Sequence, residues 1–296
     1  MHAKTRLLIA MTAFGTIALF VKNIPLPSAE IALYRAVIAA VSIFLYQSFR
    51  GNRLNLAKAK KDSLLLLLSG CAMGFNWIFL FEAYRHTTIA IATLAYYFAP
   101  VIVMIVSTFL FKERLTKKQV FCFFMSTAGL ILILGTKGTE ASANHLLGAG
   151  LGLGAAVLYA TVILLNKGIK NVSGIDRTLM QFLSAIMTLI PYIAVSRGFH
   201  LGQLGMTGLA NLLILGIFHT AICYCLFFSS LTEVSGQQVA ILSYTDPLVA
   251  ILTSVLILKE GITTFQVMGG LLILGFTLYN EVQPNKKIAE ANETLL

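Results

Sequence analysis

The sequence predicts an all-α integral membrane protein with ten transmembrane helices, arranged as two inverted five-helix repeats. Of its 296 residues, 57% are hydrophobic and only 11% are charged, whereas a soluble domain carries about 25% charged residues. The hydrophobic residues form runs of about twenty, the length with which a helix crosses the hydrocarbon core of a bilayer. The third observation is an internal repeat.

The repeat becomes visible when the sequence is shifted by about 147 positions. The residues that then coincide lie within or just after one hydrophobic run in each half: Tyr97 with Tyr244, Pro100 with Pro247, Ser107 with Ser254, Glu113 with Glu260 and Thr116 with Thr263. We therefore expect a first repeat over residues 1–136, a second over residues 147–282, and a cytoplasmic tail over residues 283–296.

Ten spans follow one another along the chain, at about 5–22, 29–49, 64–84, 88–110, 117–135, 147–166, 177–196, 207–230, 236–258 and 264–281. Lys4 and Arg6 before the first run resemble the start of a signal peptide, but no small-residue cleavage pattern follows, so we expect an uncleaved helix. Because five spans per repeat is an odd number, the second repeat enters the membrane upside down, an arrangement typical of transporters.

Lysine and arginine predict the orientation in the membrane. If the N-terminus is cytoplasmic, most of the basic residues in the short loops lie on the cytoplasmic side, as in known membrane proteins. Both termini are then cytoplasmic, and we expect a multi-pass protein of the cell (inner) membrane. The net charge of +10 fits contact with anionic lipids better than nucleic acid. The four cysteines lie in hydrophobic runs, so we expect no metal site, and no cofactor is implied.

Asp246 lies near the middle of the ninth span, where a charged residue costs roughly 2.5–3.5 kcal/mol on insertion scales. It could carry protons or bind substrate, or it could hold the helix break at Pro247 through hydrogen bonds. His219, halfway along the eighth span, is expected at a similar depth and could share a proton with Asp246; otherwise it is a packed core histidine. Pro100 and Pro247 are expected to act as paired hinges.

Arg35, about two turns into the second span, could bind a substrate carboxylate through two parallel hydrogen bonds. The alternative is an internal ion pair with Glu30 or Glu82. Five further candidates for substrate binding lie deep in spans, although Trp and Tyr normally occupy the membrane interfaces: Asn76, Trp77, Tyr97, Tyr159 and Tyr244. Core packing explains any single ring, but the set favours an amphipathic cavity.

The ten spans in two halves, with Lys-Glu-Arg-Leu-Thr at 112–116 and Lys-Glu-Gly-Ile-Thr at 259–263, resemble the drug/metabolite transporter superfamily, specifically its EamA family. The resemblance covers nearly the whole chain. It implies export of small metabolites, often amino acids or related compounds, through a central cavity between the repeats. Glu113 and Glu260 match the family pattern, and we interpret them as anchors of turns and gates, not as binding groups.

The expected function is therefore that of a secondary transporter, not an enzyme, exporting amino-acid-like or amphiphilic compounds by alternating access. One alternative is a multidrug or organic-cation exporter. Another is a membrane-embedded enzyme, which would need clustered catalytic groups, whereas the ionisable residues here are scattered. The expected partners are a small-molecule substrate, membrane lipids and, if transport is coupled, protons. The chain could act as a monomer or a homodimer.

Overall fold

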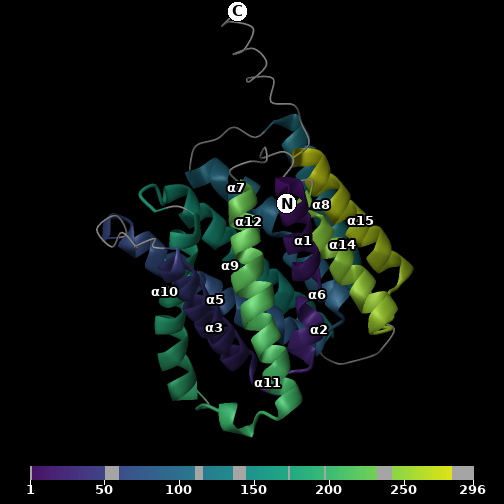
Figure 1. Ribbon diagram of the computed structural model, residues 1–296. Helices are drawn as coiled ribbons and strands as arrows, with labels where there is room; N and C mark the ends of the chain where they lie inside the picture. Colours follow the sequence, from purple (N-terminus) through teal and green to yellow (C-terminus); the bar gives the residue numbers. More distant parts are fainter. Residues whose placement is uncertain are drawn as a thin grey trace, which may run out of the picture.

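The computed structural model describes residues 2–50, 60–110, 116–135, 145–172, 174–196, 198–231 and 242–281. Within these ranges the regular elements are all helices, packed side by side in one bundle (Figure 1). Seven helices are long and apolar enough to cross a membrane, and two shorter apolar helices cover Thr245–Ile257 and Thr264–Asn280. The predicted all-α membrane class is confirmed. Glu113, the start of the predicted span 236–258 and the tail 283–296 lie outside the described residues.

The first half of the chain contains α1 (Ala3–Gly15), α2 (Ile17–Lys22), α3 (Ser28–Phe49), α5 (Ser63–His86), α6 (Ile89–Tyr96), α7 (Ala99–Leu110) and α8 (Lys117–Gly135). The second half contains α9 (His145–Gly168), α10 (Gly174–Ser196), η1 (Leu201–Gln203), α11 (Met206–Leu213), η2 (Ile214–Ile222), α12 (Cys223–Leu231), α14 (Thr245–Leu252), η3 (Thr253–Ile257) and α15 (Thr264–Glu281). The elements α11, η2 and α12 form one continuous rod (Figure 1).

The outer faces of the helices are apolar, as a lipid-facing surface requires. Phe44 on α3, Phe124 on α8 and Leu271 on α15 are all exposed. Exposed hydrophobic side chains on so many helices would be a liability in water. In a bilayer they meet hydrocarbon.

Two helices are broken at equivalent positions of the predicted repeat. A turn at Tyr97 and Phe98 separates α6 from α7, and a turn at Tyr244 precedes α14. Pro100 and Pro247 each lie in the first turn of the helix that follows the break, where the missing N–H of a proline costs little. The sequence thus tolerates both prolines because each begins a new helix.

The helices of the two halves are interleaved. α1 packs against α12 and α14, whereas α9 packs against α5 and α6. α10 packs against α3 and α5, and α8 packs against α15. Each of these contacts joins one half of the chain to the other, so the core of the bundle belongs to both halves.

Glycines permit the closest of these approaches. A Cβ atom on Gly269 would lie 2.5 Å from the carbonyl oxygen of Gly129, and one on Gly129 would lie 2.6 Å from that of Gly269. Small residues at such crossings let two membrane helices pack backbone to backbone. On α1, a Cβ atom on Gly15 would lie 2.6 Å from the carbonyl oxygen of Asp246, so Gly15 allows α1 to approach the start of α14.

Asp62, which precedes α5, fixes the loop that follows α9. Its Oδ2 accepts hydrogen bonds from the backbone N–H groups of Asn171 (2.7 Å) and Lys170 (3.2 Å), and its Oδ1 accepts from the Asn171 side-chain amide (3.0 Å). These donors, above all the backbone N–H of Asn171, lower the pKa of the Asp62 carboxyl.

Candidate functional site

Arg35 on α3 is the most deeply placed cation of the candidate site, with 3% of its surface exposed. Its Nε donates a hydrogen bond to Oγ1 of Thr220 (2.7 Å). The guanidinium carbon lies 4.6 Å from the ring centroid of Trp77 and 5.7 Å from that of Phe81. The guanidinium is therefore held by one hydrogen bond and two aromatic faces.

The predicted alternative, an ion pair between Arg35 and Glu30 or Glu82, is wrong. Glu30 pairs instead with His200 (2.6 Å), and Glu82 pairs with His86 (3.3 Å). In the described part of the chain, Arg35 has no carboxylate partner, and Glu30 and Glu82 are both engaged by histidines. A guanidinium offers five N–H donors, and the bond to Thr220 uses one.

Thr220 holds its position because η2 is a π-helix. Its hydroxyl donates to the carbonyl oxygen of Leu215, five residues earlier, at 2.7 Å, while accepting the hydrogen bond from Arg35. Short π-helical segments occur frequently at functional sites. Sequence reasoning missed Thr220, because nothing in the hydrophobic pattern distinguishes a π-helix from an α-helix.

His219 lies beside Thr220 and is buried. Its Nε2 lies 3.0 Å from Oγ1 of Thr16, and its ring centroid lies 4.6 Å from that of Phe20. The contact with Asp246 that the sequence suggested is not formed. The hydrogen bonds of His219 connect η2 to the junction of α1 and α2, and to its own helix at Ile214.

Asp246, at the start of α14, accepts a hydrogen bond from the hydroxyl of Tyr97 (2.8 Å). The ring centroid of Tyr97 lies 6.5 Å from that of Tyr244 and 6.0 Å from that of Tyr96. Tyr96 in turn lies 5.3 Å from Tyr159. Four tyrosines therefore form a row beside Asp246, and the two helix breaks meet within it.

Two further tyrosines, Tyr84 and Tyr224, lie near the aromatic side chains around Arg35. The ring centroid of Tyr224 lies 5.5 Å from that of Phe182, which packs against Trp77. Tyr84 lies on α5 one turn beyond Phe81, on the face that contacts Arg35. The sequence did not identify Tyr84 or Tyr224 as site residues.

The remaining predicted residues have different surroundings. Trp77 is buried against Arg35 and lies 5.7 Å from the ring of Phe182. The Asn76 side-chain amide donates to the carbonyl oxygen of Ala155 (2.7 Å) and so connects α5 to α9. Tyr159 is 40% exposed and marks the edge of the tyrosine row.

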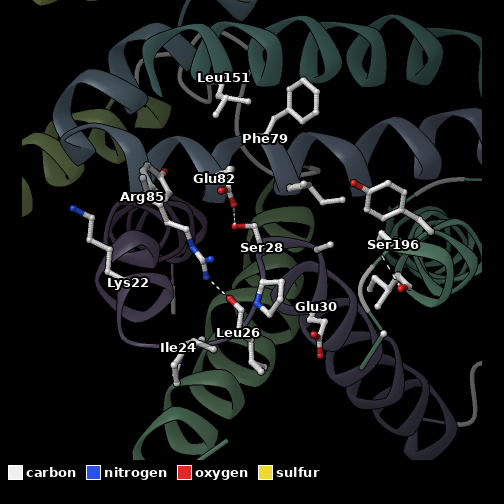
Figure 2. Close-up of a pocket in the computed structure, with 18 residues that line it drawn as sticks. Lys22, Ile24, Leu26, Ser28, Glu30, Phe79, Glu82, Arg85, Leu151 and Ser196 are labelled. Atoms are coloured by element: carbon white, nitrogen blue, oxygen red, sulfur yellow. Dashed lines mark hydrogen bonds between the residues drawn. The ribbon is translucent and has the colours of Figure 1, made fainter. Parts of the chain in front are cut away.

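A cavity of about 900 Å³ lies at the end of the bundle away from the N-terminus of α1. Figure 2 shows its walls, which come from α2, α3, α5, α9, α10 and residues 24–27. Ser28 donates to Glu82 (2.6 Å), and Arg85 donates to the carbonyl oxygen of Leu26. The lining residues include Tyr84 but none of the ten site residues expected from the sequence.

Glu260 connects three elements at this same end of the bundle. It pairs with Lys22 at the end of α2, and its Oε2 accepts hydrogen bonds from the backbone N–H of Ile89 (2.8 Å) and the hydroxyl of Ser254 (2.6 Å). The predicted equivalent, Glu113, lies outside the described residues.

Comparison with known proteins identifies relatives over the full length of the chain. The family model described as the EamA-like transporter family matches residues 5–135 and 146–280. The uncharacterized transporter YxxF of Bacillus subtilis is 32% identical over 276 residues, covering 92% of this chain and 86% of that protein. A probable amino-acid metabolite efflux pump of Salmonella typhimurium is 28% identical over 233 residues, covering 74% and 76%. One crystal structure, 18% identical, superposes with a TM-score of 0.63 over 95% of this chain and 96% of that one.

Proposed function

This chain belongs to the EamA-like transporter family, and we propose that it is a secondary transporter exporting small amino-acid-like compounds across the cell membrane. Membership indicates a transporter of small solutes and not an enzyme. The substrate class, the direction and the mechanism are our proposal. They rest on the buried Arg35 and on the arrangement of the two halves.

The observation that carries the substrate class is the environment of Arg35. A buried charge without a counter-ion is costly, and the described residues supply none. A substrate carboxylate would supply it, because a guanidinium binds a carboxylate through two parallel hydrogen bonds. Thr220 and Trp77 would orient the guanidinium for this contact.

The packing of the helices supports ten transmembrane helices in two inverted repeats, residues 1–136 and 147–282. Under the shift of about 147 positions, α1 corresponds to α9, α12 to part of α5 and α14 to α7. α1 contacts α12 and α14, and α9 likewise contacts α5 and α7, so exchanging the halves maps one set of contacts onto the other. The equivalent residues Tyr97 and Tyr244 touch. Repeat-equivalent residues meet only near the axis that relates two repeats.

Alternating access would use the helix breaks. Pro100 and Pro247 each follow an interruption of the helical hydrogen bonding, and such interruptions bend more readily than a continuous helix. Because both breaks lie in the tyrosine row beside Asp246, bending there would change the site and its accessibility together. Replacing either proline by alanine should slow transport while protein yield stays similar; normal rates in both variants would exclude the hinge role.

Asp246 is proposed to carry protons. It is partly buried in the bundle, and among the described residues it accepts a hydrogen bond from Tyr97. Carboxyl groups held within a membrane bundle are common in proton pathways. His219 contacts Thr16 and not Asp246, so a proton shared between them would need a different conformation of the protein.

The cavity end of the bundle is proposed to face outward, with both termini cytoplasmic. Single cysteines at Gln203 and Lys60, which are both exposed, test this orientation. An impermeant maleimide added to whole cells should label the cysteine at position 203, and the cysteine at 60 only after the membrane is opened. The reverse pattern would invert the proposed topology.

A second candidate, an organic-cation exporter, is favoured by the surroundings of Asp246. A carboxylate beside the rings of Tyr97 and Tyr244 is suited to a quaternary ammonium group, which aromatic faces attract. In that case Arg35 would serve structure alone.

Counterflow in proteoliposomes tests both candidates. Vesicles loaded with one unlabelled compound should accumulate the same labelled compound if it is a substrate. We expect accumulation for one or more of the twenty common L-amino acids and none for tetraethylammonium. Accumulation of the cation alone would favour the second candidate, and accumulation of neither would refute both.

A further inference from the structure

The group of contacts around Glu260 connects elements from both halves of the bundle. The loop that follows η3 turns back at Lys259, whose φ of 54° is uncommon for a residue other than glycine. This turn places Glu260 against the first residue of α6, Ile89, and against Lys22 of α2. The hydroxyl of Ser254 accepts a hydrogen bond from the N–H of Ala90 (3.3 Å). The start of α6 is therefore bound both by Glu260 and by Ser254. We name the ion pair of Lys22 and Glu260 the latch.

Lys22 belongs to the latch and to the wall of the 900 Å³ cavity, whereas Glu260 is not among the residues that line this cavity (Figure 2). The side chain of Lys22 is 28% exposed and that of Glu260 is 14% exposed. Because Lys22 lines the cavity and its side chain remains partly exposed, an anionic group entering the cavity could compete with Glu260 for it.

Two carboxylates also line the cavity, those of Glu30 and Glu82. Glu30 accepts from the backbone N–H (2.8 Å) of His200 and pairs with its ring. Glu82 is engaged by Ser28 and His86. Both carboxylates of the cavity are therefore already bound to donors. The cations that line it are Lys22 and Arg85.

The cavity also adjoins the candidate site. Tyr84 lines it, and on the same helix Phe81 and Trp77, one and two turns before Tyr84, contact Arg35. A compound that leaves Arg35 past Tyr84 would enter this cavity.

We propose that this cavity is a second substrate site, on the exit side, where the carboxylate of the exported compound takes Lys22 from Glu260 and so opens the latch. Loss of the ion pair releases the end of α2 from the corner formed by α6 and η3. Occupancy of the exit site would in this way promote movement of the first span. The inference rests on the proposed export of carboxylate compounds.

The experiment compares efflux of the L-amino acid with the strongest counterflow and of its methyl ester, which lacks the carboxylate charge. Lys22→Gln should slow efflux of the acid at least tenfold and change that of the ester less than twofold. The exchange variant Lys22→Glu/Glu260→Lys keeps an ion pair but puts a carboxylate at position 22. It loses the hydrogen bonds that Glu260 accepts from Ile89 and Ser254, so it should unfold at a lower temperature, and it should remain more defective with the acid than with the ester.

Lys118→Gln is the matched control, because Lys118 lies on α8 outside the cavity and contacts Tyr279; it should behave as the wild type. Restored acid efflux in the exchange variant would overturn the inference, because an ion pair between positions 22 and 260 would then be enough for efflux without a cation at position 22. Equal slowing of acid and ester by Lys22→Gln would overturn it too. If the wild type moves no amino acid, the proposed function itself fails. If Lys22→Gln does not fold, the exchange variant alone decides.

Discussion

Replacing Arg35 by lysine keeps the positive charge of the candidate site but removes the planar fork that binds a carboxylate through two hydrogen bonds. The variant also loses the Nε donor to Thr220, which is 2.7 Å away. We therefore expect a lower affinity for compounds with a carboxylate and little change for compounds without one.

The size of the effect follows from the bonds that are lost. A hydrogen bond to a charged group is worth roughly 1.5–3 kcal/mol, and 1.4 kcal/mol corresponds to about tenfold in affinity. Loss of one of the two bonds to a carboxylate should raise the half-saturating concentration about 10- to 140-fold. Thr220→Val, which keeps the shape of the side chain, should have a smaller effect in the same direction, because it removes only the oxygen that orients Arg35.

The assay is counterflow in proteoliposomes at varied concentrations of an amino acid and its methyl ester. Arg50→Lys is the matched control: Arg50 lies at the other end of α3, where it is exposed and its guanidinium carbon lies 5.4 Å from the ring of Tyr46. An unchanged half-saturating concentration of the acid in Arg35→Lys would refute the carboxylate role. So would an equal loss for acid and ester.

Three further predictions concern the proton, the loop after α9 and the crossing of α8 with α15. Asp246→Asn should abolish transport driven by a pH gradient but preserve exchange at equal pH, as proteoliposome flux would measure; wild-type behaviour in both assays would exclude a functional aspartate. Because hydrogen-bond donors lower the pKa of Asp62 from its ordinary value of 3.8, its carboxylate stabilises the fold at neutral pH, and this stabilisation is lost as the pH falls from 3.8 through the lowered pKa. Asp62→Asn should therefore reduce the unfolding temperature at pH 7, and the unfolding temperature of this variant should fall less on acidification than that of the wild type. Equal reductions at pH 7 and at pH 2 would contradict this. Gly269→Ala places a methyl group 2.5 Å from the carbonyl oxygen of Gly129 and should lower the unfolding temperature, whereas Gly275→Ala on the same helix meets nothing within 4 Å; equal shifts would refute the close crossing.

Hydrophobic runs were enough to predict an all-helical membrane protein, because lipid leaves helices as almost the only way to satisfy the backbone of an open chain. The few polar residues within these hydrophobic runs then pointed to Arg35 and His219, and the structure places both side chains inside the bundle. Each is costly in lipid, so its presence in a span signals an internal position. The partners of these residues could not be inferred in the same way.

Those partners depend on helix rotation and on local departures from the α-helix. Thr220 meets Arg35 because η2 is a π-helix, and no periodicity in the sequence indicates it. The expected contact of His219 with Asp246 failed for the same reason: similar depth does not fix the direction in which a side chain points. Glu260 reaches Ile89 across 171 residues of sequence, a contact that only the packed fold reveals.

The two halves of the sequence resemble each other at the helix breaks, where bending is proposed. They differ at Asp246, which has no acidic equivalent in the first half. The shift of about 147 positions superposes Tyr97 on Tyr244, yet it places Ala99 on Asp246. Two equivalent breaks give the bundle two equivalent places to bend, which favours a pair of conformations related by exchange of the halves. The carboxyl group belongs to one break alone, so protonation of Asp246 would act on the two conformations unequally. If the bundle bends at both breaks as proposed, this asymmetric charge would make the exchange between the two conformations depend on protons.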